Sequence, residues 1–295
     1  MFRRIVAFRP NANLTLRRFS VSRLNLNPFP GDEFTVSSDR GFLPRQDPPT
    51  HLPQEYAHLE SLLQRMPTTT LTGEQGLLAQ GKLGDAVHQE LPEYNLEGVT
   101  DFRLLSTLYR DLTFLASAYL LEPCDIAFQK TGDYGLGRPI LPKNIAKPLM
   151  TAATKIGAKP FMEYALSYSL YNYQRVDLSK GYDFDNLRLI RAFTNSKDEA
   201  GFILVHVAMV QHSGRLVDAV LRVLEECSNA PRMYEIDEVG LKYAVSNLER
   251  VLGDINAVME TMWSHSDPKR YLSFRTFIMG SKSQPMFPKG TFLFS

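Results

Sequence analysis

Cysteine is scarce in this chain of 295 residues. Cys124 and Cys227 are its two cysteines, and they form neither a CxxC pair nor a metal-ligand pattern with a histidine. This excludes a disulfide-stapled scaffold and a cysteine-rich zinc fold, and it indicates two reduced thiols in an intracellular protein. Long apolar runs are missing as well. No stretch approaches the roughly 20 apolar residues that span a bilayer, so we expect no integral membrane protein.

A large net charge is also absent. The 33 basic and 32 acidic residues leave a net charge of +1, which gives no overall basic footprint for nucleic acid. The N-terminus differs, because residues 1–31 contain no acidic residue and six arginines: Arg3, Arg4, Arg9, Arg17, Arg18 and Arg23. An arginine-rich, acid-free segment with interspersed apolar residues is typical of a mitochondrial targeting peptide. An untargeted disordered tail, or a wrongly chosen start codon, explains the same composition.

Several signature motifs of enzymes are missing too. The sequence has no HExxH zinc motif, no phosphate-binding P-loop and no GxSxG nucleophile elbow. Gly135 and Gly137 flank a leucine just before Arg138-Pro139, but no strand–turn–helix context surrounds them, so we predict no nucleotide site there. With 44% hydrophobic residues, the chain can still bury the core of one large or two modest domains.

Helical periodicity is what the chain does contain. Prolines crowd residues 28–53, so this stretch should be extended, although its apolar residues 41–43 (GFL) could dock on the domain behind it. From about residue 54 the pattern becomes helical, with leucines at helical spacing over residues 102–122. Sustained alternating runs of the kind that form strands are absent. We therefore predict an all-α fold.

Three helices are predicted in the second half. The sequence SKDE at residues 196–199 has the form of a capping box, and it opens a long periodic run that Gly214 bends or divides. A second helix covers about residues 236–263. A third, short helix has Asp267 as its N-cap, a proline at its first position and Gly280 just past its end.

One histidine lies on an apolar helical stripe. On a helical wheel, Phe202, Val205, His206 and Met209 share one face, which should be buried. A histidine on such a face is most often a satisfied core residue. Periodicity by itself therefore indicates no more than a helical protein with a polar-lined pocket.

An arginine on the short helix poses a stronger constraint. Tyr271, Phe274, Arg275 and Ile278 have the same spacing, so Arg275 is expected within a buried aromatic stripe. Because an arginine cannot shed its charge, its burial requires an anion. A guanidinium suits a carboxylate well, since two parallel N–H bonds form at once. Snorkelling to solvent and pairing with an internal acid are the ordinary alternatives.

Three stretches of the sequence, LPKNIAKP at residues 141–148, GFILVH at residues 201–206 and RTFIMGSKSQPMFPKG at residues 275–290, together resemble the indoleamine 2,3-dioxygenase family. The first is similar to the family's LP-(R/K)-N-I-A-x-P segment. GFILVH at residues 201–206 resembles the family helix that passes above a haem. RTFIMGSKSQPMFPKG at residues 275–290 resembles the helix that binds the substrate carboxylate, and the loop after it. The order and approximate separation of the three also fit, and the resemblance covers about residues 41–290.

The resemblance implies a two-domain helical protein that binds one non-covalent haem b in its larger, C-terminal domain. In this family ferrous iron binds dioxygen, and both oxygen atoms are inserted across the C2–C3 bond of the indole of L-tryptophan to give N-formylkynurenine. The cofactor carries the redox chemistry, while the protein orients the substrate and excludes water. The implied partners are L-tryptophan or a related indoleamine, dioxygen and haem, in a cytoplasmic monomer that binds neither nucleic acid nor membrane.

The resemblance also carries over individual site residues. Phe202 would pack against the indole ring and the haem. His206, the candidate catalytic residue, occupies a distal position that is serine in some members and histidine in others, where it could accept the indole N–H or order a water. Arg275 matches the arginine that grips the substrate carboxylate, and Tyr271 would form part of the aromatic wall. The small-domain side of the pocket would be formed by Tyr164 and Ser167.

After Gly290 this sequence departs from the family pattern. The family continues with an aromatic-Glu-Gly stretch, a Gly/Ser-rich loop at the haem edge and a helix with the proximal histidine, whereas this chain reads TFLFS at residues 291–295. None of its histidines falls in the corresponding region: His51, His58, His88, His206, His212 and His265. Since proximal ligation sets haem affinity and oxygen activation, we expect no metal ligand from this chain and no activity as written, and we favour a truncated gene model or mis-spliced product.

These observations predict three parts of the chain. Residues 1–31 form a targeting segment or disordered tail, residues 32–190 a small helical domain with a proline-rich lead-in, and residues 191–295 the first part of an incomplete haem-binding large domain. Two alternatives to a dioxygenase stay open. One is a non-catalytic protein that binds tryptophan or indole, and the other is a structural helical remnant whose polar stripe residues pair internally.

Overall fold

The computed structural model describes residues 33–293, except residues 35, 38 and 230–235. The predicted targeting segment at residues 1–31 lies outside the described residues. Within the described part helices dominate, which confirms the predicted all-α class, and the strands are only two or three residues long. None of these helices combines the length and the apolar character that crossing a membrane requires.

The elements follow one another along the chain with short connections. The helices up to residue 190 are η2 (Gln54–Tyr56), α1 (Ala57–Arg65), α2 (Leu77–Gln80), α3 (Leu83–Glu90), α4 (Phe102–Thr131), α5 (Lys143–Ile156), the π-helix η3 (Tyr164–Leu170) and η4 (Phe184–Asn186). Those that follow are α6 (Lys197–Val210), α7 (Ser213–Asn229), α8 (Glu238–Glu260), α9 (Met262–His265), α10 (Leu272–Arg275) and η6 (Thr276–Ile278). The strands form one parallel and one antiparallel pair, β1 (Ile140–Leu141) with β4 (Phe292–Leu293) and β2 (Tyr173–Arg175) with β3 (Leu187–Leu189).

Helix α4 is the centre of the fold. It confirms the helix predicted over residues 102–122 and continues nine residues further, to Thr131. Asp101 caps its start by accepting from the amides of Arg103 and Leu104 at 2.9 and 3.2 Å, and Gly132 ends it at a positive φ of 80°. Helix α5, which begins within the LPKNIAKP segment, packs along it. Asn144 of that segment donates to the carbonyls of Val87 and Leu91, which ties α5 to α3.

The main hydrophobic core crosses the predicted boundary at residue 190. Most of its residues belong to α1–α5, but Phe193, Ile203, Phe277 and Phe287 from the second half are buried in the same cluster. The division into a small and a large domain stays a prediction, and the two parts are packed together through this core.

Residues 41–43 dock as predicted. Leu43 is 2% exposed and lies in a second core cluster with Leu204 and Val207 of α6. Gly41 has a φ of +58°, and a Cβ at this position would lie 1.9 Å from the hydroxyl oxygen of Ser213. The amide of Phe42 donates to that hydroxyl at 2.9 Å. Only glycine therefore allows the lead-in to approach the junction of α6 and α7 so closely.

The predicted capping box at residues 196–199 is half confirmed. The Ser196 hydroxyl accepts from the amide of Glu199 at 3.1 Å, as a capping box requires. The glutamate, however, does not bond back to the N-cap amide. Its carboxylate accepts from the amides of Phe193 and Thr194, at 2.9 and 2.7 Å. The expected contact is replaced because the preceding residues fold back over the start of α6 and bring two further amides within reach.

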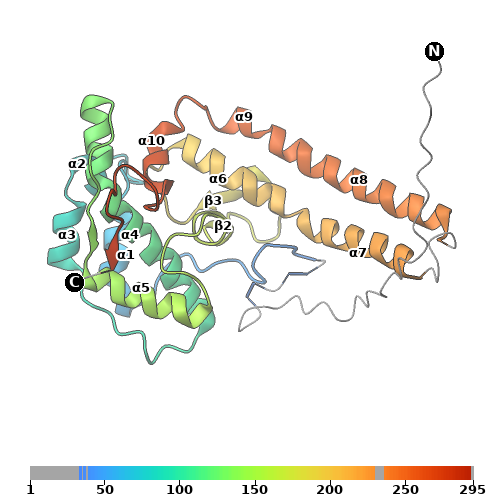
Figure 1. Ribbon diagram of the computed structural model, residues 1–295, viewed down its shortest axis with the longest axis horizontal. Helices are drawn as coiled ribbons and strands as arrows, with labels where there is room; N and C mark the ends of the chain where they lie inside the picture. Colours follow the sequence, from blue (N-terminus) through green and yellow to red (C-terminus); the bar gives the residue numbers. More distant parts are fainter. Residues whose placement is uncertain (1–32, 35, 38, 230–235, 294–295) are drawn as a thin grey trace, which may run out of the picture.

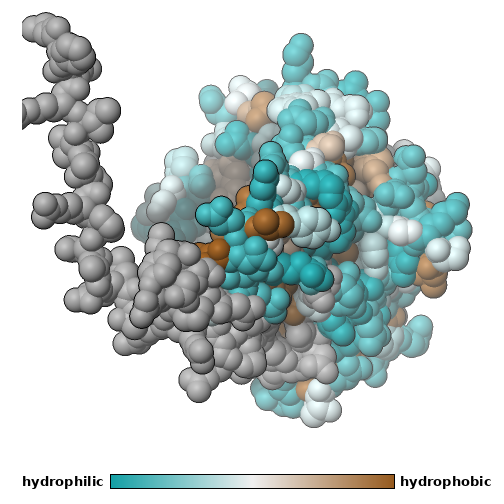
Figure 2. All heavy atoms as spheres, turned by 90° about the vertical axis from the view of Figure 1, so that its right-hand side faces the viewer, coloured by the Kyte–Doolittle hydropathy of each residue, from teal (hydrophilic) through white to brown (hydrophobic). Residues whose placement is uncertain are grey.

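The long periodic run divides close to Gly214, as predicted, with α6 ending at Val210 and α7 beginning at Ser213. Helices α7 and α8 pack side by side and extend away from α1–α5 (Figure 1). Seen from their free end, the surface is largely hydrophilic with separate hydrophobic patches (Figure 2). Several large apolar side chains of α8 are exposed, among them Val245 and Leu252, at 45% and 49%.

Candidate active site

Four of the predicted site residues meet in one aromatic cluster. Phe202 of α6 lies at its centre, with ring centroids 6.1 Å from Tyr164 of η3, 5.3 Å from His206 and 5.1 Å from Tyr271. Tyr164 and His206 also contact each other at 5.8 Å, and Phe274 closes the far side at 5.7 Å from Phe202. The cluster thus joins three segments that are far apart in sequence. Its edge-to-face and tilted pairs are the arrangements that aromatic quadrupoles favour.

This cluster lies on the most open face of α6. Phe202, His206 and Met209 are half-buried, whereas Ile203 and Val207 are fully buried. The prediction that the His206 stripe faces the core is therefore borne out only in part, since Val205 is fully buried whereas Phe202, His206 and Met209 lie at the boundary with solvent. Helix α6 is apolar almost all round, so the periodicity could not tell which side the rest of the fold would cover. Tyr164 is 41% exposed on the same open face.

His206 is oriented by the helix that carries it. Its Nδ1 lies 2.6 Å from the carbonyl oxygen of Phe202, one turn earlier. A carbonyl only accepts, so Nδ1 is the protonated nitrogen, and in the neutral ring Nε2 is then an acceptor. Nε2 makes no hydrogen bond to any residue that the structure describes. This nitrogen is free to receive a proton donor from a bound molecule.

Arg275 does not lie where the stripe predicted it. Phe274 is buried and Tyr271 is half-buried, but Arg275 is exposed, and it makes no ion pair or side-chain hydrogen bond within the described part of the chain. The expected burial of its guanidinium is wrong, because the fold covers the side of α10 that carries Phe274 and leaves the side that carries Arg275 open to solvent. The argument that a buried charge demands an anion therefore no longer applies, and a carboxylate-binding role for Arg275 stays a prediction from the resemblance.

Ser167 is separated from the open face. It lies three residues after Tyr164 in η3 but is fully buried. A π-helix turns less per residue than an α-helix, so residues three apart need not share a face. The structure therefore brings Tyr164 to the cluster and leaves Ser167 beneath it.

Two hollows lie near the cluster. A small apolar one of about 230 Å³ is bounded by Phe202, Tyr271, Trp263 and the loop after α9. Trp263, the single tryptophan of the chain, is 70% exposed at its edge. A larger hollow of about 450 Å³ opens between α4 and the loop at residues 279–282, and none of the predicted site residues lines it. The smaller hollow is thus the one that continues the aromatic cluster.

A second aromatic layer supports the first and was not predicted. Phe193 stacks between Phe114 of α4 and Phe277 of η6, with both centroid distances 4.9 Å. Tyr168 lies 5.7 Å from Phe114 and also 5.7 Å from Tyr164, so it joins this layer to the open cluster. All four rings of the second layer are fully buried. Their sequence positions show no common periodicity, because each comes from a different element.

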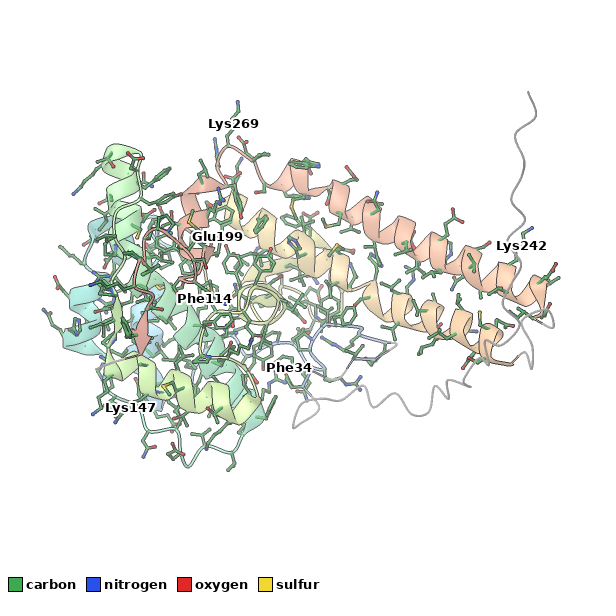
Figure 3. The ribbon with its side chains drawn as sticks, in the orientation of Figure 1. Phe34, Phe114, Lys147, Glu199, Lys242 and Lys269 are labelled. Carbon is green, nitrogen blue, oxygen red and sulfur yellow. The ribbon has the colours of Figure 1, made fainter. Side chains whose placement is uncertain are left out.

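Glu199 anchors this second layer. Figure 3 shows it close to the junction of α6 with the helices around Phe114. Besides the two backbone amides, its carboxylate accepts from the hydroxyl of Thr194 at 2.7 Å and from that of Tyr168 at 3.4 Å. Burial raises the pKa of Glu199, and the hydrogen bonds oppose this only in part. The capping-box pattern identified this residue, but not its contact with the tyrosine.

A buried ion network holds the segment that leads into α6. Arg191 donates to both carboxylate oxygens of Glu60 at 2.9 and 2.6 Å and to both of Asp111 at 3.0 and 2.8 Å. Burial works to raise the pKa of Asp111, but the guanidinium groups of Arg110 and Arg191 outweigh it and hold that pKa below its ordinary value. The network thus joins α1, α4 and the segment just before α6. Sequence analysis missed it, because its members are more than 40 residues apart.

The cluster fits one face of a flat, apolar ring system such as haem. The half-exposed rings of Phe202, Tyr164 and Tyr271 provide aromatic surface, and the free Nε2 of His206 lies among them. Within the described residues, no group of three or more His, Cys, Asp or Glu side chains could hold a metal ion. His265 lies elsewhere, stacked on Phe184 at 3.7 Å. His206 is therefore the histidine that this face presents.

Several known proteins are similar to this chain. A family model described as indoleamine 2,3-dioxygenase matches residues 31–294. The chain is 23% identical over 261 residues to indoleamine 2,3-dioxygenase 1 of Rattus norvegicus, covering 88% of this chain and 58% of the relative. It is 26% identical over 267 residues to indoleamine 2,3-dioxygenase of Saccharomyces cerevisiae, covering 88% and 54%. It is 22% identical over 253 residues to 6-hydroxytryptophan 2,3-dioxygenase fscD of Fusarium equiseti, covering 85% and 56%. The chain spans a little more than half the length of these curated relatives.

Proposed function

The chain belongs to the indoleamine 2,3-dioxygenase family, and from this premise we propose that it provides the distal, substrate-facing side of a haem-dependent dioxygenase for L-tryptophan or a related indoleamine. When bound, haem would supply the oxygen activation that cleaves the C2–C3 bond of the indole. The observation that supports this most directly is the aromatic cluster. Tyr164, Phe202, His206 and Tyr271 come from three segments and meet on one half-open face.

Phe202 and His206 suit an indole ring by complementary contacts. The Phe202 ring offers apolar surface against which an indole can pack. The indole N–H is a donor only, and the Nε2 of His206 is an unpaired acceptor once Nδ1 is bonded to the Phe202 carbonyl. One residue would thus stack on the substrate while the other fixes its rotation. Orientation of this kind is the main contribution that a protein makes beside a redox cofactor.

Arg275 would bind the carboxylate of the substrate. It lies one turn after Tyr271 on the same short helix, where its backbone amide donates to the Tyr271 carbonyl at 3.1 Å. Its exposed guanidinium makes no ion pair with another described residue, so both of its N–H edges are available. The names of the relatives, an indoleamine and a 6-hydroxytryptophan dioxygenase, describe indole substrates with an amine. An indole with an amino-acid side chain fits an aromatic wall followed by an arginine.

The single tryptophan gives a direct test of this proposal. Trp263 lines the small hollow with Phe202 and Tyr271, so haem bound at this face should quench its fluorescence saturably and develop a Soret band. Addition of L-tryptophan should then shift the Soret band. In Phe202→Ala, we expect haem affinity to fall and the shift to be lost. Phe128→Ala is the matched control, because Phe128 is a half-buried phenylalanine of α4 that stacks on Tyr134 outside the cluster.

Two outcomes of this titration would contradict the proposal. Quenching that Phe202→Ala leaves unchanged would place haem elsewhere on the chain. Calorimetric binding of L-tryptophan with no haem uptake would favour a non-catalytic indole-binding protein.

A further inference from the structure

A buried carboxylate in the second half of α4 has one oxygen that is unpaired among the described residues. Asp125 is 4% exposed, and its Oδ1 has no hydrogen-bond partner among the described residues. The side chain lines a pocket of about 530 Å³ between the second half of α4, the loop that precedes α2, the start of α6 and α10. A carboxylate oxygen that is shielded from water and has no described donor is costly, because burial removes its hydration.

The walls of this pocket are rich in groups that can pair with a small polar molecule. Five hydroxyl side chains line it: Thr68, Thr69, Thr194, Ser196 and Ser273. Gln129, one helical turn after Asp125, is exposed at the rim next to Lys130. Asp125 and Lys130 are the two charged residues that line the pocket. Because Lys130 is exposed at the rim and Asp125 is buried, the floor of the pocket is anionic.

The carboxylate of Asp125 determines the charge of the ligand that the pocket can bind. Burial raises the pKa of Asp125 to about 6, and the nearby Gln129 side chain opposes this only in part, so the group is mostly ionised at pH 7 but poorly stabilised. A bound cation would stabilise the negative charge of the Asp125 carboxylate. The compact charge of an ammonium suits a carboxylate that is almost wholly buried, whereas a guanidinium makes its best contact with both oxygens of a carboxylate.

From this geometry we propose that the pocket is a binding site for a small organic ammonium ligand that carries hydroxyl groups, with its ammonium on Asp125 and its hydroxyls on the surrounding Thr and Ser side chains. The site is separate from the aromatic cluster, since none of Tyr164, Phe202, His206 or Tyr271 lines it. The proposal therefore does not rest on the dioxygenase assignment.

Two probes of similar shape and different charge test this site. Tris(hydroxymethyl)aminomethane carries an ammonium and three hydroxymethyl groups, whereas pentaerythritol has a fourth hydroxymethyl group in place of the ammonium. We expect calorimetric titration of the 295-residue chain at pH 7 in phosphate buffer to show saturable binding of the ammonium and at least tenfold weaker binding of the neutral polyol. Equal binding of the two probes, or no binding of the ammonium, would overturn the proposal.

Variants show whether Asp125 carries the binding. Asp125→Asn keeps the shape of the side chain and should weaken ammonium binding at least tenfold. Asp133→Asn is its control, since it removes the same charge from an exposed position just beyond α4. In case Asp125→Asn folds poorly, Gln129→Lys at the exposed rim places an ammonium of the protein one turn from Asp125, and it should block the probe where Gln129→Met does not. Undiminished binding in Gln129→Lys would overturn the assignment to Asp125.

Discussion

The Nδ1 of His206 and the carbonyl oxygen of Phe202 lie 2.6 Å apart, one turn from each other on α6. This contact fixes the ring and leaves Nε2 without a described partner on the open face of the helix. The same two residues are in ring contact, with centroids 5.3 Å apart. The stacking group and the polar group of the candidate site are therefore held as one unit by their own helix.

The tautomer of His206 follows from this contact. We expect the neutral ring to carry its proton on Nδ1, because the carbonyl can only accept. Two-bond ¹H–¹⁵N correlation spectra of histidine-labelled protein distinguish the tautomers, and the His206→Gln spectrum identifies the signal. A proton on Nε2 would show that the contact does not persist in solution, and it would remove the acceptor proposed for an indole N–H.

Arg275→Ala should weaken the binding of L-tryptophan but leave the stability of the chain almost unchanged. Because the side chain is exposed and unpaired within the described part of the chain, its loss should change the free energy of unfolding by less than about 0.5 kcal/mol in urea denaturation. If Arg275 binds the substrate carboxylate, the same change should weaken L-tryptophan about tenfold or more, since a charge-assisted bond contributes about 1.5–3 kcal/mol. Tryptamine lacks the carboxylate, so its affinity should stay the same. A large loss of stability would instead favour a structural role.

Arg191→Met should be strongly destabilising. It leaves the carboxylates of Asp111 and Glu60 without the guanidinium that now bridges them, and removal of one member of a buried ion network costs about 3–5 kcal/mol. Denaturation at pH 7 measures this loss. Arg188→Met is the control, because Arg188 lies three residues earlier, is exposed and bonds only to neighbouring carbonyls. Equal losses in the two variants would mean that the network contributes little.

Asp125→Asn should stabilise the chain above pH 6. The folded carboxyl has its pKa raised from 3.8 to about 6 by burial, so the folded chain holds this proton more tightly than the unfolded chain. The free energy of unfolding therefore falls as the pH rises from about 4 to about 6. Since one pKa unit corresponds to about 1.4 kcal/mol, the variant should gain about 1–3 kcal/mol at pH 7 and nothing below pH 4. Denaturation curves at pH 4 and 7 provide the measurement, and equal gains at both would point to another cause.

Much of the local structure could be predicted because it depends on neighbours in sequence. The leucine spacing of residues 102–122 identified α4, Ser196 identified the start of α6, and Gly280 has the positive φ of 70° expected after a helix. The resemblance of residues 201–206 and 275–290 indicated Phe202 and His206, and also Tyr271 one turn before the second stretch, and the structure brings these three together. Each of these features is encoded within one or two turns of chain.

The solvent exposure of side chains and the contacts between residues far apart in sequence could not be predicted from the sequence in the same way. Helix α6 is apolar nearly all round, so the packing of neighbours such as α8, α9 and η3 decides that Phe202 and His206 are half-buried while Ile203 and Val207 are fully buried. Arg275 is exposed while its neighbour Phe274 is buried, because the fold covers only one side of α10, and the Oδ1 of Asp125 has no partner because the described segments around it place no donor within reach. By itself the sequence determined most of the helices, the Ser196 cap and the family to which the chain belongs, but not the start of the third helix, which begins at Leu272 and not after Asp267. The tertiary structure alone decided which side chains meet water, since solvent exposure depends on what the rest of the fold covers.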